Sequence, residues 1–213
     1  GRRAAAGGAV GAGAEHAARR VGELQVVVNL EVFGVHAGIV RRRWPDFRRT
    51  GDNRTMDSQQ FRAALGLFAT GVTIVTVRSA DGGLVGLTAN SFNSVSLDPP
   101  LVLWSLARRA GSMPIFTRGS HYAINILAAD QKDLAQRFAT RDIDRFAGVA
   151  WREGAGGAPV LDGAVATFEC ANRSRYEEGD HVIFVGEVER CTARQGAQPL
   201  IFHGGRYFTE LPL

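Results

Sequence analysis

The chain has 213 residues, 45 % hydrophobic and 22 % charged, a composition typical of a globular protein with an apolar core. Its formal net charge of +4 would favour a nucleic-acid or membrane partner if the folded part carried it. Residues 1–55 contain ten Arg and five acidic residues, which leaves fifteen Lys and Arg against sixteen acids, a net charge of −1, for residues 56–213. We expect no nucleic-acid partner, because phosphate neutralisation supplies most of such affinity.

Residues 1–55 are rich in Ala, Gly and Arg, and such low complexity does not build a core. We predict that this extension is either a disordered arm or sequence upstream of the true start at Met56. A transit peptide is a further reading, although the acidic residues count against it. The folded domain is predicted to span residues 56–213.

The two cysteines, Cys170 and Cys191, are too far apart for a CxxC motif and too few for a disulfide framework. They indicate reduced, half-buried thiols in a cytoplasmic protein, and we expect no metal site. The longest apolar stretch, residues 26–40, is interrupted by polar residues and is shorter than the ~20 residues of a membrane span. No membrane association is expected.

The first predicted element is a helix, which Asp57 or Ser58 can cap and which ends at residues 70–71. Residues 72–77 are mostly β-branched, and the turn residues 79–83 separate them from a second strand at 84–88, which predicts a hairpin.

Beyond the hairpin we expect a polar loop at residues 90–100 and a strand at 101–104. Ser112, followed by Pro114, is predicted to cap a helix. Further elements are expected as strands at 122–127, 165–170, 181–188 and 200–202, and a helix within 129–140. Short strands with a few helices indicate a mainly β, barrel-like domain with helical additions.

Residues 86–100 carry six small hydroxyl or amide side chains between two apolar strands. Such a rim suits an isoalloxazine ring, which needs hydrogen-bond donors and acceptors and little side-chain bulk. Composition alone equally describes a polar surface loop. There is no GxGxxG, GxxxxGK[ST], HExxH or GxSxG motif, so a nicotinamide cofactor would have to bind in an open cleft.

From Phe61 to about Tyr207 the sequence resembles the flavin reductase family, reductase components of two-component flavin monooxygenases that have an FMN-binding split-barrel fold of Greek-key type. The motifs that carry the resemblance are 68–76, 88–92 with 94–96 and 98–100, 125–127, Gln131 with 138–139, 179–181 and 204–207.

The resemblance implies that Thr88, Ala89, Asn90 and Ser91 line the flavin ring and that Ser94, Val95 and Ser96 continue the rim. It places the ribityl phosphate at Ser105, Leu106, Ala107, Arg108 and Ser112, where a helix N-terminus and Arg108 or Arg109 would favour an anion. Arg108 and Arg109 can equally be solvated surface charges. Phe138, Asp180, His181 and Tyr207 complete the set of cofactor-binding residues.

Of the five histidines, His181 stands out because it follows Gly179 and Asp180 at a turn that the family places beside the nicotinamide. A lone histidine is more often structural. We expect His181 to orient the nicotinamide and not to act as an obligatory acid or base, because hydride transfer depends mainly on alignment.

The sequence therefore predicts an NAD(P)H:flavin oxidoreductase that passes a hydride from NADH or NADPH to FMN or FAD. By the resemblance it is a homodimer with flavin near the subunit interface, and it supplies reduced flavin to a partner monooxygenase. Two alternatives stay open: a flavin-binding redox sensor or store without turnover, and an FMN-dependent reductase of another acceptor.

Overall fold

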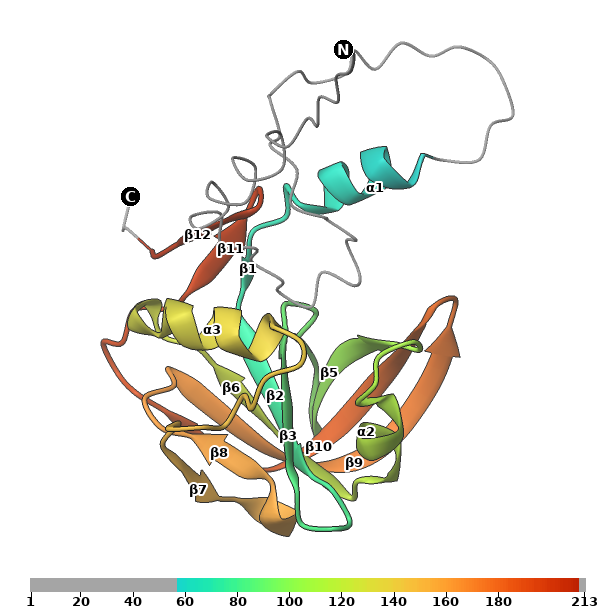
Figure 1. Cartoon of the computed structure of the whole chain (residues 1–213), viewed down its shortest axis with the longest axis vertical. Coiled ribbons are helices and arrows are strands. Elements are labelled where there is room, and N and C mark those ends of the chain that lie inside the picture. The colour runs from blue at the N-terminus through green and yellow to red at the C-terminus, as the bar shows by residue number, and fades with distance from the viewer. Residues whose placement is uncertain (1–56, 211–213) are drawn as a thin grey trace, which may run out of the picture.

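A computed structural model describes residues 57–210 of the chain, so the predictions for the extension lie outside the described residues. Its elements in chain order are α1 (Ser58–Leu65), β1 (Thr70–Gly71), β2 (Thr73–Arg78), β3 (Leu84–Ala89), β4 (Asn93–Leu97), β5 (Pro100–Ala107), α2 (Met113–Arg118), β6 (His121–Ile126), η1 (Ala129–Gln131), α3 (Lys132–Ala139), β7 (Trp151–Glu153), η2 (Ala155–Gly157), β8 (Pro159–Leu161), β9 (Ala166–Glu178), β10 (His181–Ala193), β11 (Ile201–His203) and β12 (Arg206–Phe208) (Figure 1). The prediction of a mainly β domain with helical additions is confirmed.

The main sheet has seven antiparallel strands in the order β3-β2-β6-β9-β10-β5-β4. Its two edge strands, β3 and β4, are joined by only the residues 90–92. Three linking residues reach at most ~14 Å, whereas the edges of a flat seven-stranded sheet lie ~29 Å apart. The sheet therefore has to curl until its edges approach each other, which makes it a barrel, and within residues 57–210 no ladder of hydrogen bonds joins these edges.

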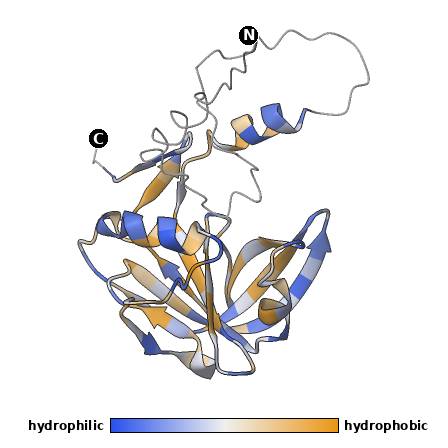
Figure 2. Cartoon of the chain, in the orientation of Figure 1, coloured by the Kyte–Doolittle hydropathy of each residue, from blue (hydrophilic) through white to orange (hydrophobic). Residues whose placement is uncertain are grey.

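An aromatic cluster fills the barrel. Trp104 stacks on Phe184 with ring centroids 4.8 Å apart, and Phe116 and Tyr122 meet its ring edge-on. All four side chains are at most 1 % exposed. A second core cluster, which includes Phe138, lies under α3, and Figure 2 shows the apolar positions along the strands and the polar residues at the tip of the β9–β10 hairpin.

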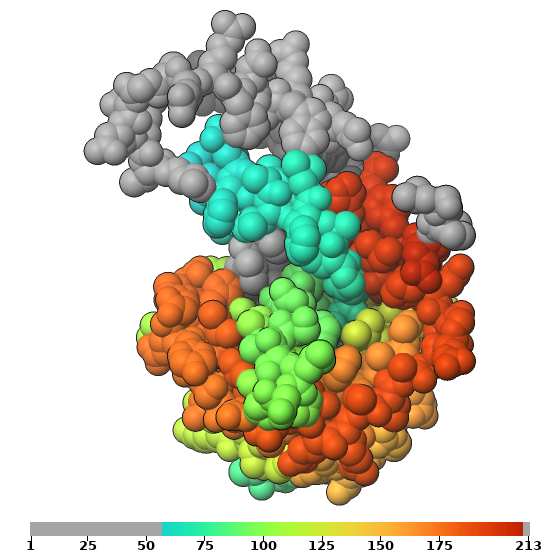
Figure 3. All heavy atoms as spheres, turned by 180° about the vertical axis from the view of Figure 1, so that it is seen from behind, coloured from blue at the N-terminus to red at the C-terminus, as the bar shows by residue number. Residues whose placement is uncertain are grey.

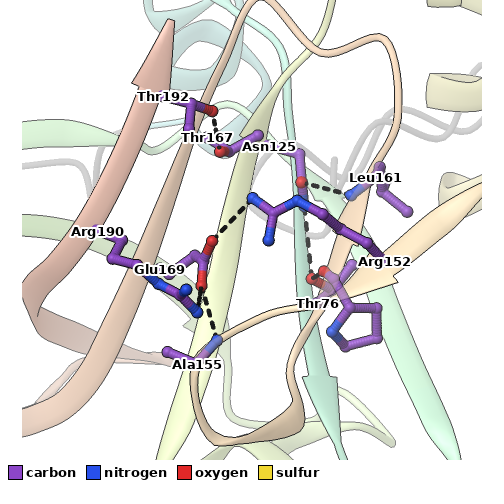
Figure 4. Close-up of polar contacts among 10 residues, drawn as sticks. Thr76, Asn125, Arg152, Ala155, Leu161, Thr167, Glu169, Arg190 and Thr192 are labelled. Atoms are coloured by element: carbon purple, nitrogen blue, oxygen red, sulfur yellow. Dashed lines mark hydrogen bonds and ion pairs between the residues drawn. The ribbon is translucent and has the colours of Figure 1, made fainter.

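The small sheet of β7 and β8 is fastened to the barrel by buried polar contacts (Figure 4). Glu169 on β9 receives hydrogen bonds from Arg152 at 2.9 Å and from the backbone N–H of Ala155 at 2.7 Å, and Arg190 pairs with it at 2.7 Å. Burial of Glu169 acts to raise its pKa, but these donors outweigh burial and hold the pKa below the ordinary value. The carboxylate is therefore held as an anion in the interior.

Several sequence predictions need correction. The first helix ends at Leu65 and is capped by Gly66, five residues before the expected end. The expected loop at 90–100 contains the edge strand β4, and the strands β7, β8 and β12 were not predicted. Neither thiol is half-buried, because Cys170 is buried and Cys191 exposed, and both are free. Among the described residues, no helix is long and apolar enough to cross a membrane.

Candidate functional site

The candidate site lies on the outer face of the paired strands β5 and β10. His181 lies opposite Ala107, and Ile183 lies opposite Ser105, in the antiparallel register. Directly opposite residues share a face and alternate residues of one strand share a face, so these four side chains project to the same side. We call Leu103, Ser105, Ala107, His181 and Ile183 the outer face. Figure 3 shows the chain segment of β3 to β5, in green, beside the orange β9–β10 hairpin.

The opposite face of the same strands belongs to the core. Val102, Trp104 and Leu106 alternate with the outer-face residues and are buried, with Leu106 at 0 % exposure. The side chain of Leu106, predicted at the phosphate, therefore points into the barrel. Only its backbone can meet a ligand.

The end of β3 is tied to the outer face through Ser91. Its hydroxyl accepts a hydrogen bond from the backbone N–H of Ser105 at 2.9 Å and donates one to the Ser105 carbonyl at 3.2 Å. Ala89 is buried at 1 % exposure, whereas Asn90 is half-buried. The structure therefore joins the predicted residues Ser91 and Ser105, with Asn90 next to Ser91 in the chain, and the Ser91 hydroxyl is engaged with the backbone.

Two predicted flavin contacts are core residues. Thr88 is fully buried and donates its hydroxyl hydrogen to the Ala135 carbonyl of α3 at 2.6 Å. Phe138 is also fully buried, with ring centroids 5.0 Å from Phe146. It packs so closely on Gly86 that a Cβ there would lie 2.6 Å from its ring. Both side chains are therefore packed in the interior and have no exposed surface.

The predicted rim residues Ser94, Val95 and Ser96 lie on the edge strand β4, beside β5. The register shifts between Ser94 and Ser96, so Val95 is the extra residue of a bulge, and its side chain is 48 % exposed. Asn93 lies opposite Leu103, which extends the outer face by one strand. These residues border the face and do not lie at its centre.

A two-residue turn brings Asp180 and His181 to the end of this face. Glu178 and His181 pair across the β9–β10 hairpin, with only Gly179 and Asp180 between them. Gly179 has a φ of +58°, a conformation that suits glycine and that tight hairpin turns require at this position. The carboxylate of Asp180 lies 2.6 Å from Nδ1 of His181. This hydrogen bond lowers the pKa of Asp180, and the charges of His181 and Arg109 lower it further.

His181 itself is mostly covered. Its side chain is 14 % exposed, against 90 % for Asp180, and its Nε2 lies below the surface without a hydrogen-bond partner among residues 57–210. Nδ1 of the imidazole is thus held by Asp180, and Nε2 is buried.

Arg108, which directly follows β5, contacts the β9–β10 hairpin through its backbone and its side chain. Its backbone N–H donates to the Asp180 carbonyl at 2.9 Å, and its guanidinium pairs with Glu177 at 3.2 Å. Ser112 occupies the N-cap position of α2, as predicted, but its side chain makes no capping hydrogen bond because its backbone is already helical. Because α2 has only six residues, its dipole is too small to make its N-terminus an anion-binding site by itself.

Tyr207, on β12, lies apart from the other predicted residues. Its ring packs on Phe202 in the second core cluster, at 5.5 Å between centroids, and burial raises the pKa of its hydroxyl. No described contact joins it to the outer face.

An open pocket of about 330 Å³ lies at the other end of β3, lined by residues 84–86 and 142–146. It contains none of the predicted site residues. Within residues 57–210, no group of three or more His, Cys, Asp or Glu side chains could hold a metal ion.

These features define a curled antiparallel barrel whose paired strands β5 and β10 carry Ser105 and His181 on the same face. Residues 65–210 match the flavin reductase like domain. The chain therefore belongs to the flavin reductase family, and the resemblance inferred from its motifs is confirmed.

Named relatives agree with this assignment. The chain is 48 % identical over 151 residues to an NADH-dependent FMN reductase, SmoA, of Agrobacterium fabrum, an alignment that covers 71 % of this chain and 85 % of that protein. It is 44 % identical to the reductase component of a flavin-dependent trigonelline monooxygenase of Acinetobacter baylyi, covering 71 % of this chain and 48 % of that one. The chain thus spans about half the length of that second relative.

Solved structures share the fold. The NADH:FAD oxidoreductase SgcE6 of Streptomyces globisporus, in complex with NAD and FAD fragments, is similar with a TM-score of 0.70 and 43 % identity, covering 73 % of this chain and 94 % of that one. The prediction of a split barrel agrees with such neighbours.

Proposed function

We propose that the protein oxidises NADH and reduces free FMN or FAD, and that it hands the reduced flavin to a flavin-dependent monooxygenase. The observation that carries the proposal is the outer face, where Ser91, Ser105 and His181 come together beside Arg108 in a chain of the flavin reductase family. The names of the relatives support both flavin reduction by NADH and delivery to a monooxygenase, since they include an FMN reductase that uses NADH and reductase components of monooxygenases.

The flavin would lie against the outer face and the end of β3. Half-buried polar groups there offer donors and acceptors, and the small side chains let backbone amides approach a flat ring. Arg108 is the candidate for the phosphate, since its guanidinium is 52 % exposed and can turn toward a ligand. The residues that would hold the flavin are Ala89, Asn90, Ser91, Ser94, Ser96, Ser105, Ala107 and Arg108.

His181 would orient the nicotinamide at the end of the same face. When bound, the flavin supplies the hydride acceptor. The residues of this chain hold the nicotinamide and flavin rings in one orientation and shield them from water. Such positioning accounts for much of the rate of a hydride transfer. No Rossmann fingerprint is present in the sequence, so both substrates would share the one face.

Exposed apolar side chains support a homodimer. Phe61 within α1 is 50 % exposed, Leu67 and Phe68 after its end are 51 % and 76 % exposed, and Phe208 of β12 is 47 % exposed. The N–H of Gly204 donates to the Gly66 carbonyl at 2.8 Å, so these two segments are neighbours. Contiguous exposed apolar residues mark interaction sites. We propose a second copy as the partner of this patch and the cytoplasm as the location.

The two alternative functions differ from our proposal in whether NADH is oxidised and whether the flavin leaves the protein. A sensor or store would bind flavin without oxidising NADH, and a reductase of another acceptor would keep its FMN through turnover. Steady-state oxidation of NADH and NADPH, with FMN, FAD and riboflavin varied in turn, separates all three. Saturation in free flavin supports our proposal, and no oxidation at any flavin concentration contradicts it.

The sharpest test of the site is His181→Ala. We expect a higher KM for NADH or slower flavin reduction, by about ten- to a hundredfold, with flavin affinity nearly unchanged, because an orienting group is lost. Stopped-flow reduction of the flavin-bound protein separates binding from hydride transfer. A wild-type rate and KM would make His181 a turn residue only and would move the nicotinamide site elsewhere.

A further inference from the structure

Tyr176 of β9 continues the outer face onto a third strand. It lies opposite Ile183 of β10, which in turn lies opposite Ser105 of β5. Directly opposite residues of an antiparallel sheet share a face, so the side chain of Tyr176 projects to the same side as those of Ile183 and Ser105. The sequence motifs do not single out Tyr176, because only the strand register brings it beside this face.

The ring of Tyr176 is accessible. Its side chain is 55 % exposed, and within residues 57–210 it has no hydrogen bond or ring contact. A single exposed aromatic side chain is common on protein surfaces. Tyr176, however, continues a row of half-buried aliphatic side chains, those of Leu103, Ile183 and Val185. An aromatic ring beside such a row is suited to a flat apolar group of a ligand.

The polar groups near the outer face lie at its opposite side. The Ser91 hydroxyl is bonded to the backbone of Ser105, and Asn90 is next to Ser91 in the chain. From β5 to β9 the surface therefore changes from polar to apolar. The isoalloxazine ring changes in the same way, since its pyrimidine ring carries the carbonyl oxygens and its dimethylbenzene ring carries only carbon and hydrogen. Because buried polar groups need partners, the pyrimidine end fits near Asn90 and the dimethylbenzene end near Ile183.

The width of this surface matches the length of the ring system. The strands β9, β10 and β5 are neighbours in the sheet, and at the usual strand spacing the backbones of Tyr176 and Ser105 are about 10 Å apart. The fused rings of a flavin cover a similar length. A second copy of the chain is the alternative occupant, but the exposed apolar patch that we assign to it lies at α1 and β12 and does not include Tyr176.

We propose that Tyr176 is a flavin-binding residue whose ring packs against the dimethylbenzene end of the isoalloxazine. This inference rests on the proposed function and adds a residue of β9 to the flavin site. The contact involves the ring system that riboflavin, FMN and FAD share. Tyr176 therefore contributes to the affinity for all three flavins and does not select among them.

Equilibrium titration of the full chain with riboflavin, FMN and FAD tests the contact. Tyr176→Ala should weaken the binding of all three about three- to twentyfold, the effect of a lost aromatic contact, and Tyr176→Phe should stay within about twofold of the parent. Arg175→Ala is the matched control, because Arg175 lies opposite the buried Phe184, on the other face, and its loss should leave riboflavin affinity unchanged. Unchanged riboflavin affinity in Tyr176→Ala would overturn the proposal.

The fluorescence of the bound flavin reports the contact independently of affinity and turnover. A tyrosine ring in contact with an excited flavin quenches its emission by electron donation, whereas a phenylalanine ring does not. Bound riboflavin should therefore be brighter in Tyr176→Phe than in the parent protein, although the two bind it about equally well. Equal brightness would show that the Tyr176 ring does not touch the flavin and would overturn the proposal.

Three other results would assign Tyr176 a different role. A loss of affinity confined to FAD would place it at the adenine, and a higher KM for NADH with unchanged flavin affinity would place it at the nicotinamide. A shift of Tyr176→Ala to monomers in sedimentation would make it an interface residue. Each of these results overturns the inference while the proposed function stands. If the parent protein neither binds nor reduces free flavin, the proposed function and the inference both fail.

Discussion

The side chains of Thr88 and Asn90, two positions apart at the end of β3, have different surroundings. The hydroxyl of Thr88 is used inside the protein, where it bonds to α3. Asn90 is half-buried at the border of the outer face, and no hydrogen bond of its side chain is found among residues 57–210. The side chain of Asn90 is therefore available to a ligand, whereas that of Thr88 is not.

This difference predicts opposite effects of two substitutions. Asn90→Ala should weaken flavin binding by about 1–3 kcal/mol, the cost of a lost buried hydrogen-bond partner, and should hardly change stability. Thr88→Val should lower the free energy of unfolding by about 1–2 kcal/mol through its lost bond to Ala135, with flavin affinity nearly unchanged. Flavin titrations and urea unfolding measure both. An unchanged dissociation constant for FMN and FAD in Asn90→Ala would remove Asn90 from the site.

The sequence could locate the site only as segments of the chain. The motif at residues 88–91 and the segment 105–108 were assigned as wholes, because a motif does not show which side chains face inward. The strand register decides this, and it separates Ser105 from Leu106 although they are neighbours. Asn125 illustrates the same limit, since its side chain joins the Ile74 carbonyl to the N–H of Leu161 and is structural.

At the scale of elements, the β9–β10 hairpin and the loop after β5 form one unit. The hairpin contributes Glu177 and Asp180, and both contact Arg108, one through its guanidinium and one through its backbone. The ion pair with Glu177 is exposed on both sides, at 52 % and 71 %, so it is weak and a stronger anion can replace it.

Glu177 should therefore compete with the flavin phosphate for Arg108. Glu177→Gln is expected to tighten FMN binding about two- to fivefold, the value of an exposed ion pair, and to leave riboflavin binding unchanged because riboflavin has no phosphate. Glu178→Gln is the matched control, an adjacent acid without an ion pair in the described part of the chain. Equal tightening in both variants would show that net charge, and not the pairing with Arg108, is responsible.

Elements with strong local signals could be predicted from the sequence. The β2–β3 hairpin follows from its β-branched run and turn residues, and it pairs in register from Thr73 to Ala89. The edge strand β4 was missed because its small polar residues are typical of a loop and only its partner β5 makes it a strand. The three-residue strands β7 and β8 are too short to show a period. They depend on contacts with distant strands, β7 with β9 through Arg152 and Glu169, and β8 with β6 through Leu161 and Asn125.

At the scale of the whole molecule, Glu169 joins segments that are distant in the sequence. Its contacts with Arg152, Ala155 and Arg190 connect β7, η2 and β10 through one carboxylate. Both arginines are about half exposed and can be solvated if the carboxylate is lost. The main cost of neutralising Glu169 is therefore the lost bonding to the buried backbone amide.

Glu169→Gln should lower the free energy of unfolding by about 1–3 kcal/mol at neutral pH. The pKa of Glu169 is depressed in the folded protein, so its contribution is complete above the ordinary value of 4.5 and is lost as the pH falls below it. The difference between variant and parent should shrink over that acid range in urea unfolding. Glu153→Gln, which breaks the exposed pair with Arg78, should cost less than about 1 kcal/mol. A constant difference at all pH values would contradict this account.

The charge distribution of the sequence makes a prediction about the domain boundary. A chain that begins at Met56 should fold and reduce flavin as well as the full chain, because the family match covers residues 65–210 and the basic charge is concentrated before Met56. Thermal unfolding and NADH oxidation compare the two. Loss of folding or of most activity would make the extension part of the enzyme.

The alternation along β5 and β10 also affects how such a protein can diversify. The side chains at positions 103, 105, 107, 181 and 183 lie on the outer face, whereas those at 102, 104, 106, 182 and 184 build the interior. If the outer face holds the substrates, as proposed, then substrate preference and folding depend on separate residues that alternate along the same two strands. A substitution at an outward position would then change which flavin or nicotinamide is accepted while the inward residues keep the barrel intact.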